Sequence, residues 1–181
     1  GRHDFIFPMF EFESKGGFAE LVHLEKDLLK HLGFKEPFVG LEYEEVCAKY
    51  GVKEIEDAQE TALGVDHGSV VLLQKFPRRT HPFWNMKHAG DGIYNKVDVL
   101  LHGMETIGSA ERSCDSDGMR ENFRTVSDGR YAATLFKLFG EKRVMDELNY
   151  FLSLPMIPRF GAGIGMTRLA RAARLHGLVK D

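Results

Sequence analysis

Two acids and an arginine are spaced evenly along the segment from Asn95 to Arg112. Asp98 lies within the apolar run Val97–Leu101, Glu105 follows seven residues later, and Arg112 seven residues after that. A carboxylate in a buried strand needs a cation or hydrogen-bond donors, because an isolated buried charge is costly. Carboxylate oxygens suit a metal ion, and a guanidinium suits an anionic substrate. The segment therefore predicts a hairpin that holds a metal and an anion, although a surface hairpin with a solvated salt bridge has the same pattern.

A second segment with possible chemistry is the glycine-rich run from Gly161 to Leu169. It reads Gly-Ala-Gly-Ile-Gly-Met-Thr-Arg-Leu, which predicts a strand that leads into a helix with Arg168 near its start. Glycines let a ligand approach the backbone closely, and a fixed guanidinium can lie against a phosphate or a purine face. The spacing differs from a dinucleotide-binding turn, which also needs an acid about twenty residues later.

The remaining pattern predicts the elements that position these segments. Residues 5–13 alternate apolar residues with acids, so Glu11 and Glu13 share one face of a strand. A further strand is predicted at 69–74. Helical spacing predicts helices at 18–32, 43–50, 54–63, 116–126 and, broken at Gly140, between 131 and 152. Because strands and helices follow no regular βαβ order, the predicted class is α+β, with a mainly antiparallel sheet flanked by helices.

Composition limits the classes of protein that fit. With 181 residues, 43% hydrophobic and 28% charged, the chain can bury a core and is most simply one domain. A net charge of −3 gives no general attraction for nucleic acid. Cys47 and Cys114 are too few for a disulfide framework or a zinc site, so a cytoplasmic protein is expected. No apolar run approaches the ~20 residues of a membrane span, so a soluble protein with no membrane partner is expected. The loop Arg78–Trp84 is expected to be solvated, with a packing tryptophan.

Three segments in order resemble the class II aminoacyl-tRNA synthetases. The run Gly161–Leu169 resembles their third signature motif, and Arg2 and His3, followed by Phe7 and an acidic strand, resemble the second half of motif 2. The Asn95–Arg112 hairpin lies between them, and its ending Ser-Ala-Glu-Arg is similar to the Gly-Ala-Gln-Arg of the aspartyl branch. The resemblance implies the class II sheet and the use of ATP with Mg²⁺.

The resemblance also implies a role for each matching residue. Asp98 and Glu105 are expected to hold Mg²⁺ on the ATP phosphates, and Arg2 and Arg168 are the expected catalytic residues. The residues expected to bind ATP are Arg2, His3, Phe7, Gly163, Gly165 and Arg168. The residues expected to bind the amino acid are Glu11, Ser109, Glu111 and Arg112.

Departures from the family pattern leave three functions open. Ile6 stands where an acid usually precedes the adenine-stacking Phe7, and Glu111 resembles the asparagine-synthetase relatives of this branch. The first hypothesis is therefore an ATP- and Mg-dependent ligase that activates aspartate as an acyl-adenylate, without tRNA, and transfers it to ammonia or another small amine. The alternative is the catalytic core of an aspartyl- or asparaginyl-tRNA synthetase, with tRNA as acceptor. A non-catalytic binding or regulatory protein is the third.

The extent of the resemblance predicts the domain organisation. Residues 1–181 are expected to form a single catalytic-core domain, and motif 1 and the first half of motif 2 have no match in them. The chain is therefore expected to be a fragment of a longer protein that lacks its N-terminal part. A homodimer is implied by the family.

Overall fold

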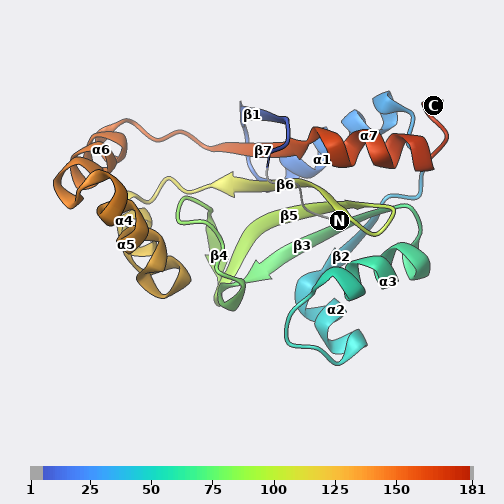
Figure 1. The fold of residues 1–181 in the computed structure, drawn as a ribbon, viewed down its shortest axis with the longest axis horizontal. Helices are drawn as coiled ribbons and strands as arrows, with labels where there is room; N and C mark the ends of the chain where they lie inside the picture. The colour runs from blue at the N-terminus through green and yellow to red at the C-terminus, as the bar shows by residue number, and fades with distance from the viewer. Residues whose placement is uncertain (1–5, 180–181) are drawn as a thin grey trace.

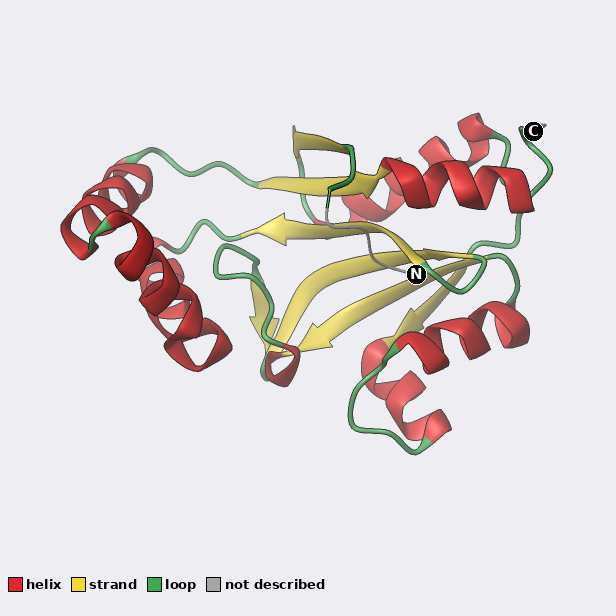
Figure 2. Cartoon of the chain, in the orientation of Figure 1, coloured by secondary structure: helices red, strands yellow, loops and turns green. Residues whose placement is uncertain are grey.

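The computed structural model of the protein describes residues 6–179. Figures 1 and 2 show a twisted central sheet with helices around it. The strands are β1 (Met9–Lys15), β2 (Val39–Glu42), β3 (Val70–Pro77), β4 (His88–Gly90), β5 (Ile93–Leu101), β6 (Glu105–Arg112) and β7 (Arg159–Gly165). The α-helices are α1 (Phe18–Leu32), α2 (Tyr43–Tyr50), α3 (Asp57–His67), α4 (Ser116–Thr125), α5 (Arg130–Phe139), α6 (Glu141–Ser153) and α7 (Met166–Leu175). The short 3₁₀ helices are η1 (Arg78–Thr80) and η2 (Val126–Gly129).

The sheet has the strand order β1-β7-β6-β5-β3-β2, and β4 pairs with β5 beside this path. Its neighbouring strands are antiparallel except for β2 and β3, which run parallel. The predicted α+β class with a mainly antiparallel sheet is confirmed. Strand β2 was not predicted, because its four residues carry too short an alternation to stand out.

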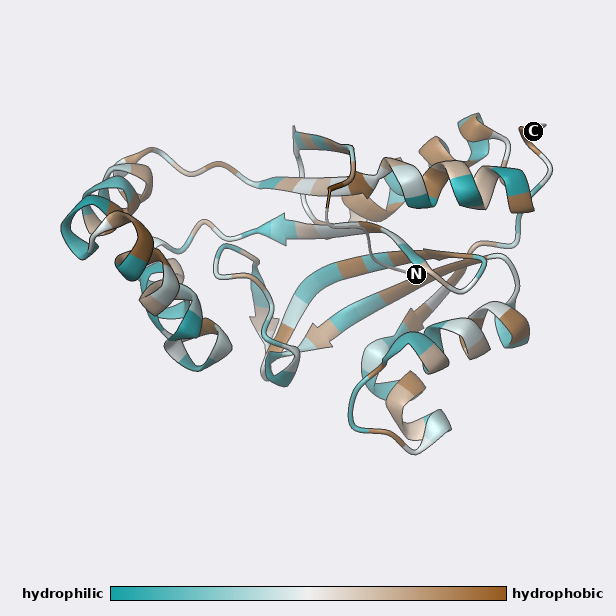
Figure 3. Ribbon diagram, viewed as in Figure 1, coloured by the Kyte–Doolittle hydropathy of each residue, from teal (hydrophilic) through white to brown (hydrophobic). Residues whose placement is uncertain are grey.

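Strand β3 is buried on both faces. Val70 and Leu72 pack in one apolar cluster with residues of α1 and α7, while Val71 and Leu73 pack in another with residues of α2 and α3. A strand covered on both sides has a continuous apolar run rather than an alternating one, which explains its clear signal in the sequence. The helices that cover it are amphipathic, and Figure 3 shows α7 with hydrophobic and hydrophilic residues alternating along it.

Helices α4, α5 and α6 form a separate cluster at one end of the sheet (Figure 1). The side chain of Trp84 joins this cluster, with its ring 5.8 Å from that of Phe123 and 5.7 Å from that of Phe151, both edge to face. Edge-to-face aromatic pairs add to the stabilisation from burial. The predicted packing tryptophan in the 78–84 loop is confirmed.

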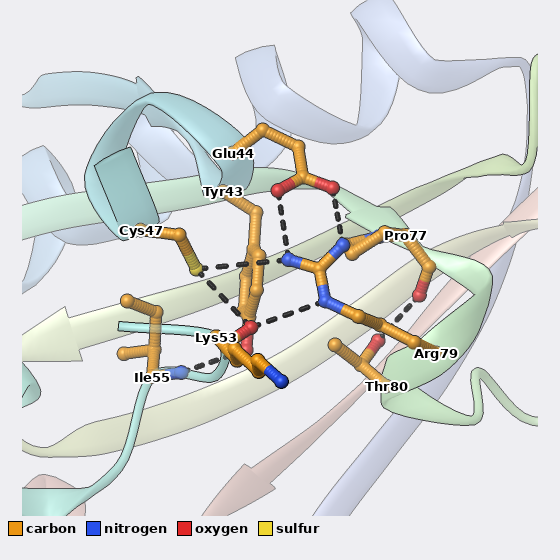
Figure 4. A network of polar contacts seen from close by, with 8 residues as sticks. All are labelled: Tyr43, Glu44, Cys47, Lys53, Ile55, Pro77, Arg79 and Thr80. Carbon is orange, nitrogen blue, oxygen red and sulfur yellow. Dashed lines mark hydrogen bonds and ion pairs between the residues drawn. The ribbon is translucent and has the colours of Figure 1, made fainter. Parts of the chain in front are cut away.

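Arg79 anchors the same loop to helix α2, as Figure 4 shows. Its guanidinium makes two bonds to the Glu44 carboxylate, one of them 2.7 Å from Nη2 to Oε2, and its Nε donates to the carbonyl of Lys53 at 3.1 Å. Two-point contacts of this kind fix orientation as well as charge. Arg79 keeps the exposure to solvent that was expected for this loop, and its ion-pair partner lies 35 residues away in sequence.

Helix α1 carries an acid into the core. Glu25 is 1% exposed, and neither of its carboxyl oxygens has a hydrogen-bond partner. Burial disfavours the charged form and raises the pKa of Glu25 to about 8; the nearby Ser109 hydroxyl opposes this shift, and the negative charge of Asp98 adds to it. Glu25 is therefore uncharged at neutral pH in the folded protein.

We expect the Glu25→Gln variant to be more stable than the unaltered protein at alkaline pH. The folded pKa lies above the unfolded value, so folding holds the proton and the wild-type stability falls as pH rises from 4.5 to about 8. Gln has no proton to lose, and its advantage should reach about 4–5 kcal/mol above pH 8 and shrink towards pH 5.

Urea unfolding at pH 5, 7 and 8.5 measures this difference in the free energy of unfolding. The matched control is Glu121→Gln at an exposed position of α4, which should leave the pH dependence unaltered. A Glu25→Gln effect of the same size at every pH would contradict the assignment.

Candidate active site

A cavity of about 660 Å³ opens on one face of strands β1, β7 and β6. The opposite face of β6 and β7 packs against α1 and α7 through apolar residues such as Ile107 and Ile164. In the antiparallel β1–β7 ladder, Met9, Glu11 and Glu13 pair with the three glycines of β7. The cavity is lined by Phe7, Met9, Glu11, Phe12, Glu13, Glu105, Thr106, Gly108, Arg112, Ala162, Gly163, Gly165, Thr167 and Arg168.

Asp98 is buried next to this cavity, and its two oxygens have different surroundings. Oδ2 lies 2.5 Å from the ammonium nitrogen of Lys96, while Oδ1 is buried without a hydrogen-bond partner. Burial raises the pKa of Asp98 to about 6; the positive charge of Lys96 opposes this shift and the negative charge of Glu105 adds to it. A buried carboxylate at this position needs a positive charge or hydrogen-bond donors, and Lys96 supplies the positive charge.

Gly108 leaves room between the two acids expected to bind metal. It lies opposite Asp98 across the β5–β6 ladder. A Cβ at this position would be 3.1 Å from Oε1 of Glu105 and 3.8 Å from Oδ1 of Asp98. The two carboxylates thus approach the same space from either side of a residue without a side chain.

This pair fits Mg²⁺ of the kind that arrives with a nucleotide. No cluster of three or more His, Cys, Asp or Glu suited to a metal occurs within residues 6–179. Mg²⁺ commonly uses one or two carboxylates, with water and substrate phosphates as its other ligands. The unpartnered Oδ1 of Asp98 is a buried acceptor of the kind that such an ion would satisfy.

Arg168 lies in the first turn of α7 and reaches the start of β6. Its Nη1 donates to the backbone carbonyl of Glu105 at 2.7 Å and lies 3.8 Å from Oε2 of the same residue. The two residues are 63 positions apart in the chain. The fold thus brings the predicted phosphate-binding arginine beside a predicted metal ligand.

Arg112 pairs with an acid at the other end of the cavity. Its Nε lies 2.9 Å from Oε1 of Glu13, a residue 99 positions earlier. Gly161 makes this pair possible, because a Cβ there would lie 2.8 Å from Nη2 of Arg112 and would collide with the Glu13 carboxylate. The guanidinium is thus fixed in place by a carboxylate that remains half exposed to the cavity.

The structure gathers most of the residues that the sequence marked for the site. Those that line the cavity are Phe7, Glu11, Glu105, Arg112, Gly163, Gly165 and Arg168. Arg2 and His3 lie outside the described residues. The side chain of Ile6, where the family has an acid, is 93% exposed.

Ser109 and Glu111 are not brought to the cavity. Successive side chains of a strand point to opposite faces, so these two lie on the other side of β6 from Gly108 and Arg112. Ser109 donates to the carbonyl of Val97 at 3.1 Å.

Glu111 is also satisfied on that far side. It is 5% exposed and accepts from Lys87 at 2.7 Å and from Asn95 at 2.6 Å. The expectation that Ser109 and Glu111 contact the amino acid together with Arg112 conflicts with this placement. Side chains alternate between the two faces along a strand, so the sequence alone already indicated that Ser109 and Glu111 face away from Arg112.

Eight neighbours of the site were not predicted as site residues: Met9, Phe12, Glu13, Lys96, Thr106, Gly108, Ala162 and Thr167. Two of them could have been found from the sequence, because residues two positions apart in a strand share a face. Glu13 lies two residues after Glu11, and Lys96 lies two residues before Asp98. Met9 and Thr167 have no chemical signal in the sequence.

Comparison with known proteins places the chain in a family. A family model described as tRNA synthetases class II (D, K and N) matches residues 5–175. The chain therefore belongs to the class II aminoacyl-tRNA synthetases, in the branch that this description names D, K and N. No curated protein matches it significantly in sequence.

Solved structures of this branch share the fold. Asparaginyl-tRNA synthetase from Pyrococcus horikoshii, complexed with asparaginyl-adenylate, has a TM-score of 0.74 at 17% identity, over 97% of this chain and 46% of that one. Asparaginyl-tRNA synthetase from Entamoeba histolytica, also with asparaginyl-adenylate, has a TM-score of 0.66 at 19% identity, over 97% and 46%. Aspartyl-tRNA synthetase from the same organism has a TM-score of 0.69 at 17% identity, over 94% and 40%.

The chain spans less than half the length of these solved proteins. At such identities the likeness establishes the fold. The family model, whose description names tRNA synthetases, agrees with the tRNA-synthetase alternative better than with the tRNA-independent hypothesis. That hypothesis also drew on Glu111, whose side chain faces away from the cavity.

In the described part of the chain, none of the helices has the length and apolar character needed to cross a bilayer.

We expect Gly108→Ala to weaken metal binding with little effect on folding. The added methyl group enters the space between the Glu105 and Asp98 carboxylates and forces Glu105 to shift. Displacing an element that orients metal ligands typically reduces affinity by roughly tenfold or more. Titration with Mn²⁺, followed by electron paramagnetic resonance, measures the affinity. Ser109→Ala, one residue along but on the other face, is the control, and equal affinities in the two variants would contradict the placement.

Proposed function

We propose that this chain is the adenylate-forming core of a class II synthetase of the aspartyl and asparaginyl type. It would activate aspartate or asparagine with ATP and Mg²⁺. The observation that carries the proposal is the single cavity with Arg168 and Glu105 at one end and Arg112 at the other. Opposite ends of one cavity can hold the two halves of an adenylate.

The nucleotide end has groups suited to each part of ATP. Phe7 lines the cavity and offers a ring on which adenine can stack. Arg168, fixed by the Glu105 carbonyl, would neutralise phosphate charge. Asp98 and Glu105 would hold Mg²⁺, which when bound would supply further positive charge at the phosphates. Gly163 and Gly165 allow the ligand to approach the β7 backbone.

The amino-acid end is built around the Arg112–Glu13 pair. A guanidinium can make two parallel hydrogen bonds to the side-chain carboxylate of aspartate, or bind the amide oxygen of asparagine. Glu11 lines the same cavity and could accept from the substrate ammonium group. The negative Glu13 beside Arg112 would lower the net attraction for a charged side chain.

The reaction needs positioning and charge neutralisation rather than a side-chain nucleophile. One oxygen of the substrate carboxylate forms a bond to the α-phosphorus of ATP, while the bond from this phosphorus to the bridging oxygen of pyrophosphate breaks. Holding the two substrates in line lowers the entropic part of the barrier. Arg168 is placed to stabilise the charge that develops on the phosphates.

Aminoacyl transfer to tRNA is the second step that the comparisons support, because the solved proteins of the same fold are named as tRNA synthetases. Amino-acid-dependent exchange of pyrophosphate into ATP, with aspartate and asparagine assayed separately, tests the first step. Incubation with labelled amino acid and either tRNA or ammonium then identifies the acceptor. If neither amino acid supports exchange, the proposal fails and the remaining hypothesis is a non-catalytic binding or regulatory protein.

Replacement of Glu105 by Ala should reduce Mg²⁺-dependent exchange by at least a factor of about 100, because one of two expected metal ligands is lost. The fold should be retained, since Glu105 is only partly buried. Exchange rates together with thermal unfolding check both points. Glu147→Ala, at an exposed ion pair on α6, is the control. Unchanged exchange in the Glu105 variant would contradict the metal assignment.

Replacement of Arg112 by Lys should weaken the amino acid far more than ATP. The ammonium keeps the charge but cannot keep the two-point geometry of the guanidinium. We expect the KM for the amino acid to rise by roughly tenfold or more while the KM for ATP changes little. Steady-state exchange kinetics with each substrate varied in turn measure the split. Arg143→Lys on α6 is the control, and equal losses for both substrates would refute the role of Arg112.

A further inference from the structure

Lys96 lies at the metal-binding end of the site without an assigned role. It pairs with Ala110 in the β5–β6 ladder, two residues before Asp98 on the same face. Its ammonium nitrogen lies 2.5 Å from Oδ2 of Asp98 and 3.7 Å from the centroid of the Phe76 ring. The side chain is 21% exposed. Lys96 is therefore held in place by a carboxylate on one side and by an aromatic face on the other.

The ammonium group of Lys96 lies in a region where several negative charges meet. The negative charges of Glu105 and Glu60 also act on Asp98, and Glu60 of α3 accepts from the backbone N–H of Glu105 at 3.3 Å. Three acids thus converge on one partly buried place. Arg168 contacts Glu105, whereas Lys96 contacts Asp98.

Lys96 and a divalent metal would use opposite oxygens of one carboxylate. Lys96 occupies Oδ2, and Oδ1 points into the space next to Gly108 and Glu105. Two cations that share a carboxylate repel each other, and this repulsion is strong where water is largely excluded. The site is thus neutralised in part before any metal arrives.

We propose that Lys96 is a built-in counter-ion that keeps Asp98 available as a one-oxygen ligand and lowers the affinity of the empty site for divalent metal. Metal then binds firmly only when the phosphates of a nucleotide supply further negative oxygens. This inference rests on the proposed function, because it assigns the metal to Asp98 and Glu105. It goes beyond that function by making metal occupancy depend on the nucleotide.

Lys96→Gln is the sharpest test, since Gln can still donate to Oδ2 of Asp98 but carries no charge. With a nearby positive charge removed, the affinity for Mn²⁺ alone, measured by electron paramagnetic resonance at pH 8 without nucleotide, should rise by roughly tenfold. Lys96→Arg keeps the charge and should retain the wild-type affinity.

Lys75→Gln is the matched control. Its ammonium lies 4.1 Å from the centroid of the Phe18 ring and 2.6 Å from Oδ1 of Asn95, so it too contacts an aromatic ring and an oxygen acceptor, here a neutral amide away from Asp98. Its Mn²⁺ affinity should match that of the unaltered protein. A gain in both glutamine variants would show a general effect of net charge and would overturn the proposal.

Asp98→Asn separates failure of this inference from failure of the proposed function. If Asp98→Asn loses Mn²⁺ but Lys96→Gln binds it no more tightly than wild type, the metal site stands and the role of Lys96 is refuted. If Asp98→Asn binds Mn²⁺ as wild type does, both fail. Should Lys96→Gln be too unstable to titrate, a tenfold change of affinity in Lys96→Arg would equally overturn the proposal.

Discussion

The buried carboxylate of Asp98 is the constraint around which the site is arranged. A charge in an interior strand needs compensation, and Lys96, packed over Phe76, provides it at 2.5 Å. The second oxygen needs open space instead, and Gly108 on the neighbouring strand provides that. Lys96 on β5 and Gly108 on β6 thus both serve the same acid, one as its counter-ion and the other by leaving space beside it. Glu105 can approach the same space only because Gly108 has no side chain.

Strand β6 separates two chemically different environments. Its residues Gly108 and Arg112 face the cavity, while Ser109 and Glu111 face the side covered by α1. Glu25 lies buried on that covered side without hydrogen-bond partners. Burial raises the pKa of Glu25 as it raises that of Asp98, but only Asp98 has a cation beside it. Glu25 is therefore an uncharged core residue at neutral pH, whereas the carboxylate of Asp98 is paired with an ammonium group.

The family membership and the cavity support the same chemistry from independent directions. The family model matches almost the whole chain through its sequence, whereas the cavity brings together Arg168, Glu105 and Arg112 through the fold. The argument for a tRNA-independent enzyme drew on the altered motif 2 at Ile6 and on the identity of Glu111. Glu111 is bonded to Lys87 and Asn95 on the covered face and does not line the cavity.

The sequence by itself determined the elements and the residue types of the site. The 18–32 and 43–50 helices, the 95–112 hairpin and the glycine-rich strand follow from local periodicity, and Asp98 with Glu105 follows from an acid in an apolar run. Only the tertiary structure decided the partners: Arg112 with Glu13 across 99 positions, and Arg168 with Glu105 across 63. The physical reason is that periodicity is a property of neighbouring residues, whereas the face of a strand that becomes a cavity depends on which helices cover the other face.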